Sequence, residues 1–372
     1  MVKSGSSGLE YDAWLASAKM PSALLLEILE YARSPKLCYD AFQQRDAAIL
    51  ALIPPRFQRI LQQNGTADIL AEYKNRMEKH DIHVIRIHEP EYPEKLECIS
   101  DSPPLLFYQG NPDCLNRRII AMVGSRSASY SGQKATVKLA EELSRRGISI
   151  ISGMACGIDA SAHQGCIDGG SGTIAVTACG LDRIYPAENE VLHGRILDSG
   201  GIILSEYSPG EKPLGWHFPV RNRIITGIAD ALVLMEARIR SGSMTSVRHA
   251  LDQGKDVFVY PGDPASDHFE GNHQLLREGG IYFTSADDIL EDMGWLDNQT
   301  QVRQNSDCLK TAGSFTQDEA LIISVLEPGT LGFEELLKKS GLDPSVTLST
   351  LTILQIRGII EALPGKQYRI KQ

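Results

Sequence analysis

Six short apolar runs between residues 119 and 263 are each followed closely by glycine, serine or arginine. Helix-length amphipathic segments separate them. Strands that are covered by helices on both faces have continuous Val/Ile-rich sequences, because both faces are buried. This spacing predicts an α/β fold with a doubly wound, mostly parallel sheet. The expected strands are 119–123, 148–151, 173–177, 201–204, 231–235 and 257–260.

The residues that follow these runs indicate where a ligand would bind. In doubly wound sheets, ligands bind outside the carboxyl ends of the strands. Glycines let a ligand approach the backbone, and helix N-termini offer N–H groups to anions. Arg126, Arg238 and Arg240 lie in these loops. Together they predict a long anionic ligand.

Composition excludes some classes of protein. The net charge of −10 argues against a protein that coats nucleic acid generally, although a local basic groove remains compatible with it. Seven cysteines occur without a C-x-x-C pair, which predicts reduced thiols and a cytoplasmic location. No apolar stretch is long enough to cross a membrane. Residues 1–8 look like a linker added for expression.

The chain divides into three expected domains. Residues 9–80 predict a small helical domain, and 82–295 the sheet domain, with an irregular proline-containing bridge over 89–111. Residues 297–314 are polar and predict a linker. Residues 315–372 predict three short helices and a hairpin, which is a winged helix. The expected sheet-domain helices are 131–146, 158–168, 188–199, 219–228, 243–253 and 272–278.

Two strand-to-helix loops are candidate anion sites. Ser125 and Arg126 follow the first run, where they would hold a phosphate or form a tight turn with a surface arginine. Residues 241–245 repeat this geometry just after Arg240. The dinucleotide motif G-x-G-x-x-G is absent here, so a nicotinamide cofactor is disfavoured and no cofactor is expected.

Residues 212–223 (KPLGWHFPVRNR) interleave basic and aromatic side chains. Lys212, Arg221 and Arg223 would follow phosphates, while Trp216 and Phe218 would stack on unpaired bases. The alternative is that both aromatic residues belong to the core ahead of a helix. The pattern favours single-stranded nucleic acid over a duplex, because a duplex offers no free base faces.

Catalysis is not predicted. Asp159 and His163 lie four residues apart on one helical face, where they would form an acid–base dyad, a metal pair or a structural contact. No third metal ligand is evident, and no motif places a nucleophile, a base and an oxyanion site together. We therefore expect a protein that is not an enzyme and has no metal site.

The winged helix has little charge for binding a duplex. Residues 315–372 contain six Lys/Arg and seven Asp/Glu, a net charge of −1. Reading a duplex requires neutralisation of phosphates. An accessory or protein-contact module is therefore favoured over a duplex reader.

Eight segments of the sheet domain, taken in order, carry a family resemblance. They are VGSR (123–126), SGMACGIDASAH (152–163), CGLDRIYP (179–186), LSEY (204–207), FPVRNRII (218–225), RSGSMTSVRHAL (240–251), VFVYPGD (257–263) and GNHQLLREGG (271–280). Together they resemble the DNA-processing protein A (DprA/Smf) family. The helical domain, of SAM-like type, and the winged helix also fit the layout of that family. Ser246 and Gly280 stand where the family often has alanine.

The resemblance implies an extended Rossmann-like domain that binds single-stranded DNA. It also implies a homodimer that protects incoming strands and helps to load RecA during natural transformation. No membrane partner is implied. The DNA-binding residues expected on this basis are Ser125, Arg126, Gly153, Lys212, Phe218, Arg221, Asn222, Arg223, Arg240, Ser241, Gly242, Ser243, Met244 and Thr245.

Two other functions and one alternative placement stay open at this stage. A Rossmann-like phosphoribohydrolase would carry a catalytic glutamate, but residues 245–251 contain no acid. A winged-helix regulator of duplex DNA is opposed by its charge. Ile281, Ile289 and Leu290 are expected at a dimer interface, or else cover the edge of the sheet.

Overall fold

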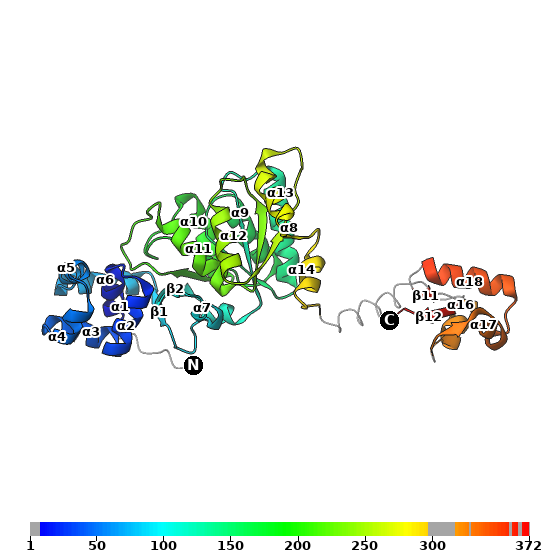
Figure 1. Ribbon diagram of the computed structural model, residues 1–372, viewed down its shortest axis with the longest axis horizontal. Helices are drawn as coiled ribbons and strands as arrows, with labels where there is room; N and C mark the ends of the chain where they lie inside the picture. The colour runs from blue at the N-terminus through cyan, green and yellow to red at the C-terminus, as the bar shows by residue number, and fades with distance from the viewer. Residues whose placement is uncertain (1–7, 297–316, 327–328, 357–358, 364–366, 372) are drawn as a thin grey trace. The chain divides into compact units, whose positions relative to one another are not determined.

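The computed structural model describes residues 8–296, 317–326, 329–356, 359–363 and 367–371. The chain forms two compact units, 1–294 and 295–372. Each unit is described by itself (Figure 1). The expression linker expected over 1–8, apart from Gly8, and the linker expected over 297–314 lie outside the described residues.

A nine-stranded sheet runs through the first unit in the order β1-β2-β6-β5-β4-β3-β7-β8-β9. The neighbours from β6 to β9 pair in parallel, and the predicted α/β fold is confirmed. The strand order reverses direction between β3 and β7, which makes this the switch point of the sheet. The bounds are β1 His83–Arg86, β2 Leu105–Gly110, β3 Ile119–Gly124, β4 Ser149–Ser152, β5 Ile174–Val176, β6 Ile202–Ser205, β7 Ala231–Glu236, β8 Asp256–Val259 and β9 Ile281–Tyr282.

Helices pack against the sheet, and every residue of β3, β4, β6 and β7 except Gly124 is buried. Each of the six expected crossover helices is present, with bounds that differ from the prediction by no more than two residues. A short α14 follows β9. The helices are α8 Tyr130–Arg145, α9 Ile158–Gly169, α10 Glu190–Asp198, α11 His217–Ile228, α12 Ser243–Asp252, α13 Glu270–Arg277 and α14 Ala286–Asp292.

The segment 89–111, expected to be irregular, is more regular than its sequence indicates. It contains the short helix α7 (Glu94–Glu97) and the strand β2, which pairs antiparallel with β1 on one side and β6 on the other. Pro103 and Pro104 stand immediately before β2. Prolines are tolerated directly before a strand, so they disguise the strand in the sequence without preventing it.

Six helices precede the sheet and belong to the same compact unit. They lie beside the β1–β2 edge (Figure 1). Arg86 on β1 donates from Nε and Nη2 to the two carboxylate oxygens of the buried Asp12 on α1, at 2.8 and 2.6 Å. This bidentate pair attaches the helices to the sheet. They are α1 Leu9–Ser17, α2 Ser22–Ala32, α3 Pro35–Gln43, α4 Ala47–Leu52, α5 Pro55–Asn64 and α6 Ala67–Lys79.

The second unit is the winged helix that the sequence predicts. Three helices enclose a small core that includes Ile322, Leu336 and Leu354, and a three-stranded sheet has the order β10-β12-β11. The elements are α16 Gln317–Leu326, β10 Leu331–Gly332, α17 Phe333–Ser340, α18 Pro344–Ile356, β11 Ile360–Leu363 and β12 Gln367–Ile370.

The prediction of a dimer interface is wrong for two of the three residues that it named. Ile289 and Leu290 on α14 are buried inside the unit, and Ile281 on β9 is half-buried. The helix turns its apolar side inward, so the alternative that these residues cover the edge of the sheet holds for Ile289 and Leu290. Of this segment, Tyr282 on the edge strand β9 is well exposed. A homodimer itself stays a prediction.

Replacing Ile289 should therefore destabilise the fold and leave the oligomeric state unchanged. Removing a fully buried Ile side chain leaves a cavity, so Ile289→Ala should lower the free energy of unfolding by about 2–5 kcal/mol in urea titrations. Tyr282→Ala, on the exposed edge, is the matched control and should change stability by about 0.5 kcal/mol or less. A variant at Ile289 that keeps full stability but changes its mass in light scattering would contradict this packing.

Candidate nucleic-acid interface

A cavity of about 550 Å³ opens at the carboxyl ends of β3 and β7, at the switch point of the sheet. We call it the switch-point cavity. Residues from the loops after β3, β4, β5, β6 and β7 line it, together with residues of α9, α11 and α12. Among the predicted site residues, it brings together Ser125, Arg126, Phe218, Arg221, Asn222, Ser241, Gly242 and Ser243.

The loop after β3 approaches the start of α9 so closely that two glycines are required. A Cβ on Gly124 would lie 2.4 Å from the Ile158 side chain, and one on Gly157 would lie 2.3 Å from the carbonyl oxygen of Ser125. Gly157 also has a φ of +77°, which favours glycine. The amide of Ile158 donates to the Ser125 carbonyl at 3.2 Å. This close packing sets where Ser125 and Arg126 can lie.

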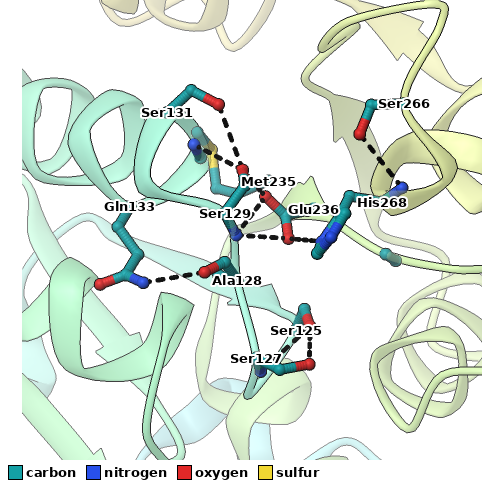
Figure 2. A network of polar contacts seen from close by, with 12 residues as sticks. Ser125, Ser127, Ala128, Ser129, Ser131, Gln133, Met235, Glu236, Ser266 and His268 are labelled. Atoms are coloured by element: carbon teal, nitrogen blue, oxygen red, sulfur yellow. Dashed lines mark hydrogen bonds and ion pairs between the residues drawn. The ribbon is translucent and has the colours of Figure 1, made fainter.

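A buried carboxylate fixes the other side of the same loop. Glu236, the last residue of β7, accepts bonds from the Ser129 amide (2.9 Å) and hydroxyl (2.5 Å), and His268 Nδ1 lies 2.9 Å from it (Figure 2). The Ser129 hydroxyl also accepts from the amide of Gly132 and so caps α8. Glu236 thereby holds the loops after β3 and β8 against the end of β7.

Arg221 on α11 supplies a fixed positive charge at the cavity. Its Nη1 donates to the backbone carbonyls of Gly153, at 2.7 Å, and Val176. Gly153 is required here, because a Cβ would lie 2.4 Å from the guanidinium. Burial lowers the pKa of Arg221 to about 10, so the side chain stays protonated at neutral pH. Since carbonyls and not a paired carboxylate hold it, much of its charge remains available to a ligand.

The charges around the cavity favour an anion. Arg126 and Arg221 line it together with a single carboxyl group, that of Asp159, which gives a net charge of +1 for the lining residues. Arg126 adds to the lowering of the Arg221 pKa, because the two guanidinium groups repel each other. Burial raises the pKa of Asp159, and Arg221 opposes that shift. A local positive site therefore exists on a protein that is acidic as a whole.

An aromatic side chain lies beside these charges. The guanidinium carbon of Arg126 lies 4.7 Å from the centroid of the half-buried Phe218 ring. The Tyr185 ring lies 5.6 Å from the same centroid and is exposed. Tyr185 was not among the predicted residues, although it lies in the segment 179–186 that carries the resemblance. A cationic group and two aromatic rings thus share one wall of the cavity.

The start of α12 also lines the cavity. Ser241, Gly242 and Ser243 contribute to it, and the helix begins without a side-chain cap. The buried hydroxyl oxygen of Ser241 has no hydrogen-bond partner among the described residues. The Met244 and Thr245 amides donate to the carbonyls of Ser241 and Gly242, at 3.2 and 3.1 Å. The positive end of the α12 dipole, at a helix start that no side chain caps, favours an anion here.

Several predicted residues lie away from the cavity. Gly153 supports Arg221 from behind, while Lys212 and Arg240 are exposed and, with the half-buried Met244 and Thr245, do not line it. Arg223 is directed elsewhere. Its side chain is only 7% exposed, and its guanidinium donates to Asp101 at 2.9 Å and to Glu206 at 2.8 Å. These carboxylates neutralise it, so Arg223 supports the fold and is not placed to meet a phosphate here.

Asp159 and His163 do not form a dyad. Asp159 faces the cavity beside Arg221, whereas His163 is fully buried and its Nδ1 lies 2.8 Å from Thr173 Oγ1. This is the structural alternative for His163. Among the described residues, no group of three or more His, Cys, Asp or Glu side chains is placed to hold a metal ion. None of their helices is long and apolar enough to cross a membrane.

The comparison with protein families settles the relationship. Residues 83–294 match the model of DNA recombination-mediator protein A. The chain belongs to this family. Residues 310–366 match the DprA winged helix domain, in agreement with the fold of the second unit. The family and the extended Rossmann-like fold expected from the sequence segments are both confirmed.

Characterised relatives extend over most of the chain. The DNA processing protein DprA of Streptococcus pneumoniae is 43% identical over 199 residues, which cover 54% of this chain and 70% of the relative. Protein Smf of Escherichia coli is 32% identical over 301 residues, which cover 80% of this chain and 79% of the relative.

Solved structures agree with this relationship. The X-ray structure of the pneumococcal DprA superposes with a TM-score of 0.65 at 35% identity, covering 76% of this chain and 97% of that one. A structure of DprA from Helicobacter pylori, described by its single-stranded DNA binding mode, superposes with a TM-score of 0.52 at 28% identity. The match covers 57% of this chain and 95% of that one. The chain is thus a relative of DNA processing proteins.

The buried His163 should make stability depend on acid. Burial lowers its pKa from 6.5 to about 3. Between these values the unfolded chain binds a proton that the folded chain does not, so stability falls as the pH falls from about 6.5 to 3. The slope from one such group is at most about 1.4 kcal/mol per pH unit. His163→Gln should remove this contribution in urea unfolding measured at several pH values. An unchanged slope would mean that the imidazole is not buried in the neutral form.

Proposed function

We propose that this protein binds single-stranded DNA at the switch-point cavity and acts as a recombination mediator without enzymatic activity. The observation that carries the proposal is the grouping of Phe218, Arg126 and Arg221 around one cavity. Arginines and the N-terminal end of a helix attract phosphates, and an aromatic ring stacks on an unpaired base. A duplex offers no free base face to such a ring.

The family and its relatives support the wider role. The family description names a recombination mediator, and the Helicobacter relative is described as binding single-stranded DNA. The resemblance in the sequence adds loading of RecA on incoming strands during natural transformation, within the cytoplasm. We include both in the proposal.

A homodimer belongs to the same proposal. One cavity holds a few nucleotides, and two cavities on one dimer raise the effective concentration of the second contact. Light scattering at micromolar concentration, with and without DNA, tests this part. A protein that stays monomeric in both states would remove the dimer from the proposal and leave binding at a single cavity to be tested separately.

A titration that compares single-stranded with duplex DNA of equal length tests the central claim. Fluorescence anisotropy should give the tighter dissociation constant for the single strand, with a strong dependence on salt because bound phosphates release counterions. Equal affinity for both forms, or tighter binding of the duplex, would contradict a site built on an unpaired base.

Asp159 supports a second candidate, an enzyme that acts on nucleotides. Its carboxyl group lines the cavity, and burial raises its pKa, as is common for catalytic acids. Its position beside Arg221 is explained equally by charge balance. Incubation with nucleoside monophosphates separates the two functions, because only a phosphoribohydrolase would release free base.

Two neighbouring substitutions should affect binding in different ways. Arg126→Ala should weaken binding and reduce the log–log salt slope by about 0.7, the value for one phosphate contact on a single strand. Phe218→Ala should weaken binding by roughly 1–3 kcal/mol with no proportionate change in slope, because stacking releases no counterions.

Arg59→Ala, an exposed arginine on the remote helix α5, is the matched control and should bind like the unmodified protein. Melting curves show whether each variant is folded. If Arg126→Ala is folded and keeps both affinity and slope, phosphates are not bound at this cavity.

A further inference from the structure

A second cavity, of about 290 Å³, lies between the turn that joins α1 to α2 and the sheet domain. We call it the Trp216 pocket. Lys19 and Met20 line it from this turn, and Tyr207, Trp216, Val220 and Arg223 line it from the sheet domain. None of the residues that line the switch-point cavity lines this pocket.

The two cavities lie on opposite sides of the start of α11. Phe218 and Asn222 line the switch-point cavity, whereas Val220 and Arg223 line the Trp216 pocket. Successive residues of a helix are turned by about 100°, so these two sets point in roughly opposite directions. The same helix end therefore forms a wall of both cavities.

An aromatic platform stands at the edge of the Trp216 pocket. Trp216 is 55% exposed, the highest exposure of any aromatic residue lining either cavity. Its ring packs edge-on against His217 at 4.1 Å, and Lys19 Nζ lies 5.8 Å from its centroid. His217 is buried and stacks on Tyr207 at 4.0 Å. The indole is thus held in place from below while it stays accessible.

An unsatisfied polar group lies in the wall of the pocket. Tyr207 is 6% exposed, and its buried hydroxyl has no hydrogen-bond partner among the described residues. A buried hydroxyl without a partner costs free energy, which a ligand with a donor or acceptor would recover. The pocket therefore combines a stacking surface with a buried hydroxyl that lacks a hydrogen-bond partner among the described residues.

The charges of the pocket disfavour a phosphate. Asp101 and Glu206 neutralise Arg223, and Glu211 lies 2.6 Å from Lys19. Two cations and three carboxylates surround the site, a net charge of −1. An uncharged planar group with hydrogen-bonding edges fits these conditions, and an anion does not.

A strand bound in the first cavity can reach this pocket. Gly215 lines the switch-point cavity, is exposed, and would have no atom within 4 Å of an added Cβ, so the rim beside Trp216 is open. Residues 216 and 218 are separated by at most about 7 Å of backbone. Bases of nearby nucleotides in one strand can therefore contact Phe218 and Trp216.

We infer that the Trp216 pocket binds an unstacked base of the same single strand whose phosphates occupy the switch-point cavity. The base stacks on Trp216 and bonds to the Tyr207 hydroxyl, and the N-terminal helices form the outer wall. This inference rests on the proposed function, and it gives the helical domain a direct part in binding DNA.

Oligothymidylates of increasing length, from about four to about twenty nucleotides, test the inference on the full chain. Trp216→Ala should weaken binding about five- to a hundredfold for strands long enough to reach the pocket, with an unchanged salt slope. The shortest strand that binds should be unaffected. Trp216→Phe should retain most of the affinity, and Leu214→Ala, an exposed apolar residue of the same loop, should bind normally.

Tyr207→Phe removes only the unpartnered hydroxyl. It should keep or raise the melting temperature, and it should weaken the binding of long strands by roughly two- to tenfold. An abasic nucleotide is then placed at each position of the strand in turn. Besides the position that contacts Phe218, a second position should lower the affinity of the unmodified protein. At that second position the abasic nucleotide should not lower the affinity of Trp216→Ala. This double-mutant cycle identifies the contact of Trp216 with a base.

The outcomes separate the two proposals. If the unmodified protein binds no single strand, the proposed function fails. If it binds and responds to Arg126→Ala and Phe218→Ala, but Trp216→Ala binds every length normally, only the Trp216 pocket is overturned. The same holds if Trp216→Ala weakens the shortest strand as much as the longest.

Discussion

The site depends on the buried carboxylate of Glu236 at the end of β7. At this point the strand order reverses, and the loops after neighbouring strands separate in opposite directions to leave a crevice. Such a crevice has a defined shape only if its loops are held. Glu236 binds Ser129 from one loop, with His268 from another loop beside it, and Gly132 leaves room for its carboxylate (Figure 2). The positions of Ser125 and Arg126 follow from this attachment.

The overall charge of the protein is a poor guide to this site. The chain carries a net charge of −10, yet the residues that line the switch-point cavity carry +1. The lining is positive because it contains Arg126 and Arg221 but only one carboxyl group, that of Asp159. Backbone carbonyls, which have no formal charge, hold Arg221 in place. A positive group that is fixed in this way keeps its field and loses little conformational freedom on binding. A strongly basic surface is therefore not needed to make this cavity locally positive.

Local sequence patterns predicted the sheet and its helices because each run contains its own signal. Runs such as 119–123 are apolar throughout, and their buried strands need no distant partner to be recognised. The strand β2 was missed because Pro103 and Pro104 precede it. Ile289 and Leu290 were misplaced for a different reason. The apolar side of an amphipathic helix looks the same in a sequence whether it covers its own sheet or a second subunit.

Arg221 and Arg223 show which part of the site lies beyond sequence reasoning. They are two residues apart on α11, so they point to different sides of the helix and meet different segments. Arg221 meets carbonyls and keeps its charge for a ligand. Arg223 meets Asp101 and Glu206, which are 122 and 17 residues away in the chain, and their negative charges balance its positive charge. No spacing rule relates these acids to the FPVRNRII segment, so only the fold distinguishes the two arginines. The consequence is chemical: one side of α11 is suited to phosphates, and the other to an uncharged base.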